Sequence, residues 1–327
     1  MSRVVVTGGC GFIGGHLVER LVADGDEVTV FDAAPPGDRR PVPDGVRYVA
    51  GDIRDPEAVG AAIDDRTDTV YHLAAVVGVD QYLARPLDVI DINFSGSRTV
   101  LDAATRAGAR VLMASTSEVF GKNPAVPWRE DGDRVLGPTS ADRWTYSSSK
   151  ALTEHLTYAF ARQHGTAATV IRYFNVYGPG QRPAYVVSRS VHRALNGLPP
   201  VVYDNGIQTR CFTFIEDAVE GTVRAARAAA GAGETFNIGS MTETTVKEVI
   251  EVVNELAGFG GPARDTDTRE ALGPSYEDLS RRVPDSTKAR DVLGWSCQVP
   301  LEEGLRRTVA WARENPWWLA LSDTGAA

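Results

Sequence analysis

Short runs of β-branched and aromatic residues alternate with longer segments of helical periodicity along the first half of the chain. The first run is Val4–Val6, and Ile13–Ala23 follows it with apolar residues spaced three to four positions apart. Further strands are predicted at Glu27–Phe31, Arg47–Val49, Thr69–His72, Arg110–Ala114 and Ala168–Arg172, and further helices at roughly residues 56–64, 87–107 and 147–164. This alternation predicts an α/β fold with a doubly wound parallel sheet.

The pattern becomes less regular beyond about residue 175, where proline and glycine are more frequent. Thr245–Ala257 and Leu301–Arg313 still show the spacing of amphipathic helices, whereas residues 258–284 have the composition of a loop. The length of 327 residues corresponds to two domains at about 150 residues each. The second half is therefore expected to form a smaller domain of its own.

Composition and charge exclude several classes of protein. Asp and Glu total 43 against 34 Lys and Arg, and this formal charge of −9 argues against nucleic-acid or anionic-membrane binding. No apolar run approaches the ~18 residues that a bilayer-spanning helix needs, and the first residues do not form a signal peptide. The three distant cysteines and five scattered histidines give neither a disulfide framework nor a metal site. We therefore predict a cytoplasmic protein.

A glycine-rich loop, Thr7–Gly14, follows the first predicted strand and opens the first predicted helix. Its glycines Gly8, Gly11 and Gly14 have G-x-x-G-x-x-G spacing, a variant of the dinucleotide-binding fingerprint. Glycine lets the backbone turn sharply and approach a pyrophosphate, and the helix N-terminus offers free N–H groups to it. Asp32 ends the second predicted strand 18 residues after Gly14, where it can accept hydrogen bonds from both adenosine ribose hydroxyls. A tight structural turn is the alternative, but this setting predicts a dinucleotide.

The carboxylate of Asp32 would repel the 2′-phosphate of NADP, so the predicted cofactor is NAD, although Arg39 and Arg40 nearby leave NADP open. Small and apolar residues at the ends of the following strands extend the predicted site. The further cofactor-binding residues are predicted to be Phe12, Ile13, Asp52, Ile53, Leu73, Ala74, Ala75 and Asn93. His72 is expected to be a packed strand-end residue without a catalytic role.

Tyr146 and Lys150 form a Y-x-x-x-K pair that shares one helix face. A lysine ammonium stabilises a phenolate, so the pKa of the tyrosine is expected to fall toward neutrality, and the phenolate could then take the proton of a sugar hydroxyl. A surface pair is the alternative. However, Ser115–Glu118 directly follows the strand Arg110–Ala114, at the sheet edge where open α/β folds bind their ligands. We therefore predict Thr116, Tyr146 and Lys150 as catalytic, with Tyr146 and Lys150 also touching the cofactor.

Five segments carry a resemblance to a known family: the glycine loop, Ser115–Gly121, the Tyr146/Lys150 pair, Arg172–Pro179 and Phe236–Gly239. Together they resemble the extended short-chain dehydrogenases/reductases that act on nucleotide sugars. The resemblance implies a Rossmann-like NAD-binding domain at residues 1–174, to which segments near 212–238 return, and a C-terminal α/β domain at 175–327 that binds the nucleotide sugar. It also implies that NAD is reduced and reoxidised within one turnover.

The residues after the catalytic threonine separate the subfamilies. The 4,6-dehydratases carry Asp-Glu there, and Ser117 in place of that Asp disfavours dehydration. Simple 4-epimerases usually lack a carboxylate at the position of Glu118, whereas UDP-glucuronate decarboxylases closely resemble Ser115–Gly121. Ser148 stands where apiose synthases have a cysteine, which disfavours ring contraction.

Three further segments resemble the decarboxylase branch that contains UDP-xylose synthases and aminoarabinose-pathway decarboxylases: Arg143–Tyr146, Gln208–Thr213 and Tyr276–Pro284. The resemblance implies that UDP-glucuronate is oxidised at C4 with Tyr146 as base and that the resulting β-keto acid loses CO₂. Glu118 and Arg282 would orient the sugar or help to protonate it. The product would leave as UDP-xylose or as the 4-keto pentose. A nucleotide-sugar 4-epimerase, a 4,6-dehydratase and a non-catalytic NAD-binding regulator remain the alternatives.

Polar residues of the second half are expected to hold the nucleotide sugar. The predicted substrate-binding residues are Ser117, Asn175, Arg182, Arg189, Tyr203, Arg210, Tyr276 and Arg282. The arginines can pair bidentately with phosphate, and for each of them a solvated or locally paired surface charge is the alternative. The resemblance also suggests a homodimer formed through the helices near 87–107 and 147–164.

Overall fold

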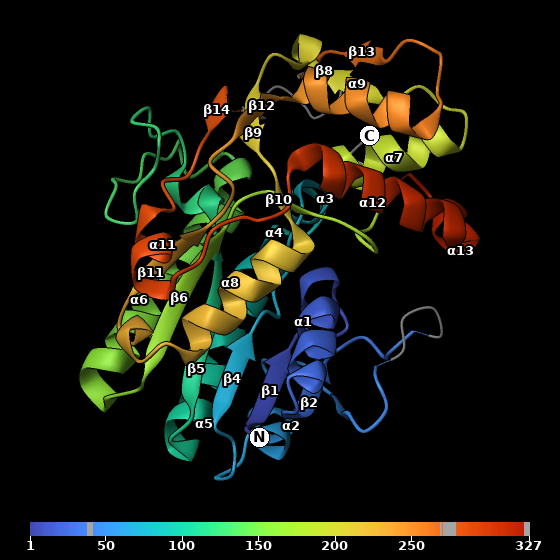
Figure 1. The fold of residues 1–327 in the computed structure, drawn as a ribbon. Helices are drawn as coiled ribbons and strands as arrows, with labels where there is room; N and C mark the ends of the chain where they lie inside the picture. Colours follow the sequence, from blue (N-terminus) through green and yellow to red (C-terminus); the bar gives the residue numbers. More distant parts are fainter. Residues whose placement is uncertain (38–41, 269, 271–278, 324–327) are drawn as a thin grey trace.

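The computed structural model describes residues 1–37, 42–268, 270 and 279–323. Its centre is a seven-stranded sheet with the strand order β11-β6-β5-β4-β1-β2-β3 (Figure 1). The strands are β1 (Arg3–Thr7), β2 (Glu27–Asp32), β3 (Arg47–Ala50), β4 (Thr69–His72), β5 (Arg110–Thr116), β6 (Ala168–Tyr173) and β11 (Thr235–Ile238). All neighbouring strands are parallel. The predicted doubly wound sheet is confirmed, and each predicted strand lies within an observed one.

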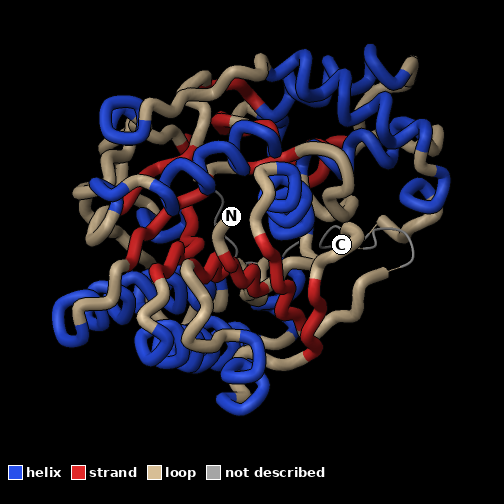
Figure 2. The backbone as a smooth tube through the Cα atoms, turned by 60° about the horizontal axis from the view of Figure 1, so that its bottom comes forward, coloured by secondary structure: helices blue, strands red, loops and turns tan. Residues whose placement is uncertain are grey.

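Helices cover both faces of this sheet, as Figures 1 and 2 show. One face carries α1 (Phe12–Ala23) and α8 (Ile215–Arg227), and the other carries α2 (Pro56–Ala62), α5 (Ser97–Ala107) and α6 (Arg143–His164). Successive strand residues point to opposite faces. Val4 and Val6 of β1 therefore join one buried cluster, and Val5 joins the other. Both faces are apolar, which is why the strands appear in the sequence as continuous hydrophobic runs.

The helix predicted at 87–107 is interrupted. The structure has α4 (Pro86–Asp91), a π-helical turn η1 (Ile92–Gly96) and then α5. Side-chain hydroxyls of Ser97 and Thr153 both donate to the carbonyl oxygen of Asn93, at 2.6 and 3.1 Å. Such bonds give this carbonyl partners outside the regular helical ladder, and π-turns of this kind often mark functional sites.

The helix predicted from residue 147 begins earlier, at Arg143, so Tyr146 and Lys150 lie on one continuous helix, α6. β5 also extends two residues beyond its predicted end and includes Ser115 and Thr116. The segment predicted to be catalytic is therefore the end of a buried strand, which fixes its backbone more firmly than a loop would.

A second layer of shorter elements covers the carboxyl ends of the strands (Figure 1). Its helices are α7 (Val186–Leu195), α9 (Val246–Ala257), α12 (Leu301–Glu314) and α13 (Pro316–Leu319), and its small strands are β7 (Val176–Tyr177), β8 (Val201–Tyr203), β9 (Thr209–Cys211), β10 (Thr213–Phe214), β12 (Glu243–Thr245), β13 (Arg264–Thr266) and β14 (Arg281–Arg282). The segment 258–284, predicted as a loop, contributes β13 and β14. Thr245 starts α9 through a capping box with Glu248. The remaining short elements are α3 (Val79–Ala84), η2 (Ser117–Phe120), η3 (Asp204–Gly206), η4 (Ala229–Gly231) and α11 (Thr287–Leu293).

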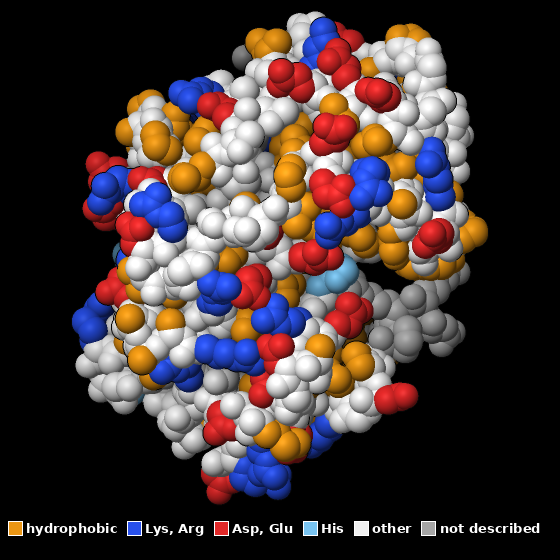
Figure 3. Space-filling view, viewed as in Figure 1, with side chains coloured by type: hydrophobic (Ala, Val, Ile, Leu, Met, Phe, Trp, Pro, Cys, Tyr) orange, Lys and Arg blue, Asp and Glu red, His pale blue; other side chains and the backbone are white. Residues whose placement is uncertain are grey.

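Acidic and basic side chains are interspersed over the face shown in Figure 3. In the part of the chain that the structure describes, no helix is both long enough and apolar enough to cross a membrane.

Candidate active site

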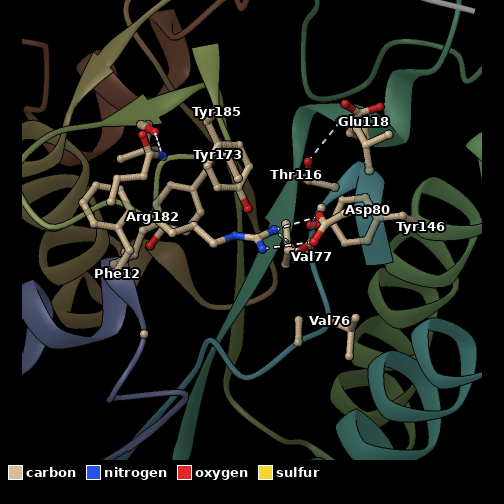
Figure 4. Close-up of a pocket in the computed structure, with 18 of the residues that line it drawn as sticks. Phe12, Val76, Val77, Asp80, Thr116, Glu118, Tyr146, Tyr173, Arg182 and Tyr185 are labelled. Atoms are coloured by element: carbon tan, nitrogen blue, oxygen red, sulfur yellow. Dashed lines mark hydrogen bonds and ion pairs between the residues drawn. The ribbon is translucent and has the colours of Figure 1, made fainter. Parts of the chain in front are cut away.

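A cavity of about 900 Å³ lies between the carboxyl ends of the central strands and the second layer. The loops that follow β1, β2, β4 and β5 form one wall, and residues from α6 and α7 and from the small strands β8, β9 and β14 form the other. Ligands of open α/β sheets bind at this edge, where the strand order reverses. Figure 4 shows ten labelled side chains that converge on this space.

The glycine loop has the geometry that a pyrophosphate requires. Gly8 has φ +73°, and a Cβ there would lie 2.7 Å from the backbone nitrogen of Ala74. A Cβ on Gly14 would lie 2.1 Å from the carbonyl oxygen of Gly8, so neither position tolerates a side chain. α1 begins after Gly11 without a side-chain cap, so its first N–H groups are available to an anion at the cavity wall.

Asp32 lies at the end of β2 and lines the cavity. Its carboxylate accepts backbone hydrogen bonds from Cys10 and Ala34, both at 3.0 Å, which fix it beside the glycine loop. The described cofactor-binding candidates that line the cavity are Gly8, Gly11, Phe12, Ile13, Gly14, Asp32, Asp52, Ile53, Leu73, Ala74, Ala75, Tyr146 and Lys150. These residues form one continuous surface from the glycine loop to α6.

Asn93 is the exception, because it lies behind the cavity wall. It is fully buried in η1, where its amide exchanges two hydrogen bonds with the backbone of Val76 and donates a third to Ser149. Asn93 therefore braces the loop after β4 against α6, and only its neighbours reach the cavity. Arg39 and Arg40 lie outside the described residues.

Tyr146, Lys150 and Thr116 come together as predicted, with Tyr146 and Thr116 adjacent in Figure 4. The Thr116 hydroxyl hydrogen-bonds to the Tyr146 phenol, which lowers the pKa of Tyr146. Burial is the larger influence, however, and together with the nearby Glu118 carboxylate it raises this pKa above its ordinary value. Burial likewise lowers the pKa of Lys150 to about 8. In the protein alone the expected fall in the pKa of Tyr146 is therefore wrong, because Lys150 loses its proton before Tyr146 would ionise.

Glu118 meets a cluster of arginines at the far end of the cavity. One carboxylate oxygen lies 2.6 Å from Nη1 of Arg282 and the other lies 3.2 Å from Nη2 of Arg143. Arg210 is the register partner of Arg282 on the neighbouring strand and is close enough to act on Glu118 electrostatically. Burial alone would raise the pKa of Glu118, but these arginines outweigh it and lower the pKa to about 2. Glu118 is therefore held as an anion, which does not favour its predicted role in protonating the sugar.

The predicted substrate arginines line the cavity, and each is already held by protein groups. Arg210 donates to the carbonyl oxygens of Thr209 and Leu279 at 2.7 and 2.8 Å. Arg189 pairs with Asp323 at 2.6 Å and donates to the Tyr203 hydroxyl at 3.1 Å.

Arg182 reaches across the cavity in Figure 4 and pairs with Asp80 at 2.9 Å, so it links the second layer to the loop after β4. Asn175 lines the cavity with φ +38° and donates to the carbonyl oxygen of Cys211. Ser117 also lines the cavity, and Tyr276 lies outside the described residues.

Among the cavity residues that sequence reasoning did not assign to the site are Arg143, Asp80 and Tyr185. A signal existed for Arg143, since it precedes Tyr146 by three residues and so shares its helix face. Asp80 and Tyr185 lie on segments that only the tertiary structure brings to the cavity. No group of three or more His, Cys, Asp or Glu side chains within residues 1–37, 42–268, 270 and 279–323 is arranged to hold a metal ion.

The fold and the site together define a nucleotide-dependent enzyme of the Rossmann type with a Tyr–Lys pair. Residues 4–239 match the family model described as the NAD dependent epimerase/dehydratase family, and the chain belongs to this family. Its cofactor is NAD, in agreement with the fit of the glycine loop and Asp32.

Two curated relatives and one solved structure are similar over nearly the whole chain. The UDP-N-acetyl-alpha-D-glucosaminuronate decarboxylase of Bacillus cytotoxicus is 36% identical, over 96% of this chain and 98% of that protein. UDP-glucuronic acid decarboxylase 1 of Xenopus tropicalis is 34% identical, over 96% of this chain and 73% of that protein. The structure of MoeE5 in complex with UDP-glucuronic acid and NAD superposes with a TM-score of 0.83 at 31% identity, over 96% of this chain and all of that one.

Proposed function

We propose that this protein is an NAD-dependent decarboxylase of UDP-glucuronate or a closely related UDP-uronate. The observation that carries the proposal is the Glu118 cluster. Arg143, Arg210 and Arg282 surround a single carboxylate in the cavity that also holds Tyr146. The positive charge exceeds the negative charge there, and such a surplus favours an anionic sugar over a neutral one. The two decarboxylase relatives support the same activity.

NAD, when bound, accepts a hydride from C4 of the sugar and can return it later in the turnover. The loop from Gly8 to Gly14 would hold its pyrophosphate and Asp32 its adenosine ribose, since both line the cavity in suitable geometry. The positive charge of an oxidised nicotinamide beside Tyr146 would favour the phenolate and offset the effect of burial on its pKa.

Tyr146 acts as the base that removes the proton from the C4 hydroxyl, and Thr116 shares a hydrogen bond with it. Lys150 supports the phenolate through its ammonium charge. Arg282, with Arg143 behind it, holds the sugar carboxylate so that its bond to C5 can align with the new C4 carbonyl. Glu118 keeps both guanidinium groups in place. The carbonyl then accepts the electron pair that CO₂ leaves behind.

A second candidate is 4-epimerisation, which uses the same oxidation and keeps the carboxylate. The test is mass spectrometry of products from UDP-glucuronate, UDP-N-acetylglucosaminuronate and UDP-glucose. We expect CO₂ and a pentose nucleotide, or its 4-keto form, from a uronate. Formation of UDP-galacturonate without CO₂ would establish the epimerase instead. Ser117 leaves the protein without the acid that dehydration needs at that position.

We further propose that the chain forms two functional domains. Residues 1–174, with later segments near 212–238 that include the edge strand β11, would bind NAD, and the rest of 175–327 would bind the nucleotide sugar. β11 pairs with β6 in the central sheet, which supports the return of this segment.

We also propose a cytoplasmic homodimer. Leu87 and Ile90 of α4 and Leu152 of α6 are 79%, 48% and 48% exposed, and α4 packs against α6, so these side chains belong to neighbouring helices. Burying them against a second copy would stabilise a dimer through the hydrophobic effect. The cysteines Cys10, Cys211 and Cys297 are free thiols, which fits a reducing compartment. A monomer in light scattering at micromolar concentration would contradict the dimer.

A further inference from the structure

A second buried glutamate lies beneath the catalytic pair. Glu154 is one helical turn after Lys150 on α6, and its side chain is 7% exposed. Its carboxylate accepts two hydrogen bonds from Arg172 of β6, at 2.7 and 2.9 Å, and a third from the Ser115 hydroxyl of β5, at 2.5 Å. One side chain thus joins α6 to the two strands on which it packs.

Glu154 is the charged group that opposes the loss of a proton from Lys150. Lys150 is 3% exposed, and burial lowers its pKa to about 8, whereas the charge of Glu154 raises it. The other titratable groups near this point do not replace Glu154. His72 is kept neutral by burial and by Lys150 itself, since its pKa falls to about 3, and Tyr146 carries no charge before it reacts.

Among the described residues, two arginines interact with Glu154, and the carboxyl group of Glu130 is near enough to act on Arg172. Arg172 is held by both carboxylate oxygens of Glu154, and Arg134 lies close enough to interact with Glu154 electrostatically. Within the described residues, Glu154 lies one helical turn from Lys150 on α6 and is the carboxylate whose charge acts on its ammonium.

The same carboxylate fixes the strand that carries Thr116. Ser115 immediately precedes Thr116, and the two residues are opposite Arg172 and Tyr173 in the β5–β6 register. Because Ser115 and Arg172 both bind Glu154, the end of β5 is tied to the helix that carries Tyr146 and Lys150. A shift of β5 relative to α6 would break these bonds and separate the Thr116 hydroxyl from the phenol.

We propose that Glu154 is a positioning residue for the oxidation step, which holds Lys150 in its ammonium form and keeps Thr116 aligned with Tyr146. This role rests on the proposed function only in that the reaction begins when Tyr146 removes a proton from a sugar hydroxyl. Glu154 itself touches neither the cavity nor the substrate, because it is absent from the cavity lining.

The chain offers a direct test, since it contains four lysines: Lys122, Lys150, Lys247 and Lys288. The protonation of each can be followed by NMR of isotopically labelled lysine side chains as the pH is raised, and Lys150→Met assigns the signal of Lys150. In Glu154→Gln, which keeps a hydrogen-bonding side chain but removes the charge, we expect the midpoint of Lys150 to fall by about one pH unit or more. An unchanged midpoint in the folded variant would overturn the proposal.

The pH dependence of turnover in Glu154→Gln provides a second measurement. Loss of the ammonium at lower pH should move the alkaline limb of turnover to lower pH by the same interval, with a loss of about fivefold or more at pH 8. The affinity for UDP should stay within about twofold, because Glu154 lies outside the cavity. Glu154→Asp keeps the charge and should restore the limb. If Glu154 were merely structural, turnover would fall equally at every pH.

Glu130 provides the matched control. It is a partly buried carboxyl group that accepts a hydrogen bond from the backbone of Asn237, and its own carbonyl oxygen accepts one from Arg172. Glu130→Gln should leave the midpoint of Lys150 unchanged, and an equal shift in this variant would contradict the assignment to Glu154.

Glu154→Gln leaves Arg172 buried without its partner, which could prevent folding. In that case the double variant Glu154→Gln/Arg172→Met, which removes both charges, is used for the same lysine titration. The lysine titration needs no substrate. It therefore tests this role even if no uronate is decarboxylated, and the product panel above tests the proposed function separately.

Discussion

The glutamates Glu118 and Glu154 act on Tyr146 and Lys150, respectively, and differ in how their own charge is balanced. Glu118 faces the cavity and is surrounded by more positive than negative charge. Glu154 lies beneath the cavity, where Arg172 holds both of its oxygens and Lys150 is the cation one turn away. The first arrangement can accommodate a further anion, and the second is already complete.

This difference distinguishes a cluster that can bind an anionic ligand from one that only supports neighbouring residues. A group of arginines that exceeds its carboxylate gains stability when an anionic ligand arrives, whereas a satisfied buried pair gains nothing from one. We therefore assign Glu118 and its arginines to the proposed substrate site, and Glu154 to the framework that supports the proposed base. The following experiments test this assignment, beginning with Tyr146.

Tyr146→Phe should have the largest effect, because both clusters act through the proton transfer that this phenol carries out. We expect turnover to fall by about 10²–10⁴-fold, the usual range for loss of a general base. Binding of NAD and UDP, measured by calorimetry, should change little, since the ring remains. Full activity in this variant would mean that neither cluster is organised around Tyr146, and a non-catalytic NAD-binding role would then become the better interpretation.

Arg282→Ala should reduce CO₂ release by about a hundredfold, the loss expected when one partner of a buried charge pair is removed at a binding site. Binding of NAD should be within about twofold of the wild type, because Arg282 belongs to β14 of the second layer, whereas the glycine loop follows β1 of the central sheet. Isotope-labelled uronate gives the CO₂ rate, and fluorescence quenching gives NAD affinity. Equal losses in both would place Arg282 in the general framework instead.

Removing an arginine should reduce the free energy of unfolding more in the Glu154 cluster than in the Glu118 cluster. Arg172→Met leaves Glu154 buried without its guanidinium and should cost about 3–5 kcal/mol in the free energy of unfolding. Arg143→Met leaves Glu118 its 2.6 Å contact with Arg282, so the carboxylate keeps a buried partner and the cost should be smaller. Urea denaturation of both variants measures the difference. If Arg143→Met proved the more damaging, the Glu118 cluster would be structural.

The smallest effect concerns His72, a buried base that has no counterion. Its hydroxyl partners Thr7 and Ser97 lie at 2.7 and 2.9 Å, and burial lowers its pKa from 6.5 to about 3. Below pH 6.5, His72 binds a proton in the unfolded chain, whereas in the folded chain it binds one only below about pH 3. Stability should therefore fall as the pH drops through this interval, by about 1 kcal/mol between pH 7.5 and 5.5.

His72→Asn should remove that dependence, as urea denaturation at the two pH values would show. A slope that is unchanged in His72→Asn would assign the dependence to other groups. The comparison between buried His72, which has no balancing charge, and buried Lys150, which has that of Glu154, would then be unsupported.

The elements of the NAD-binding half could be predicted from the sequence because their signals are local. Two-sided burial makes β1 and β5 continuous apolar runs, and the tight turn at Gly8 excludes every side chain. The prediction of one helix at 87–107 does not include its π-turn, because one of the two hydroxyls that bond to the Asn93 carbonyl comes from Thr153, 60 residues away. The second half was less predictable, since its strands of two or three residues carry no periodicity.

The sequence by itself determined the class of fold, the dinucleotide loop and the identity of Thr116, Tyr146 and Lys150, since spacing along one strand, loop or helix is enough to place them. Only the tertiary structure decided which charges meet. It paired Glu118 with Arg143 and Arg282 and Glu154 with Arg172, and it showed that burial raises the pKa of Tyr146. Charge pairing and desolvation depend on distance and on the surrounding dielectric, and neither quantity is encoded in any one segment of the chain.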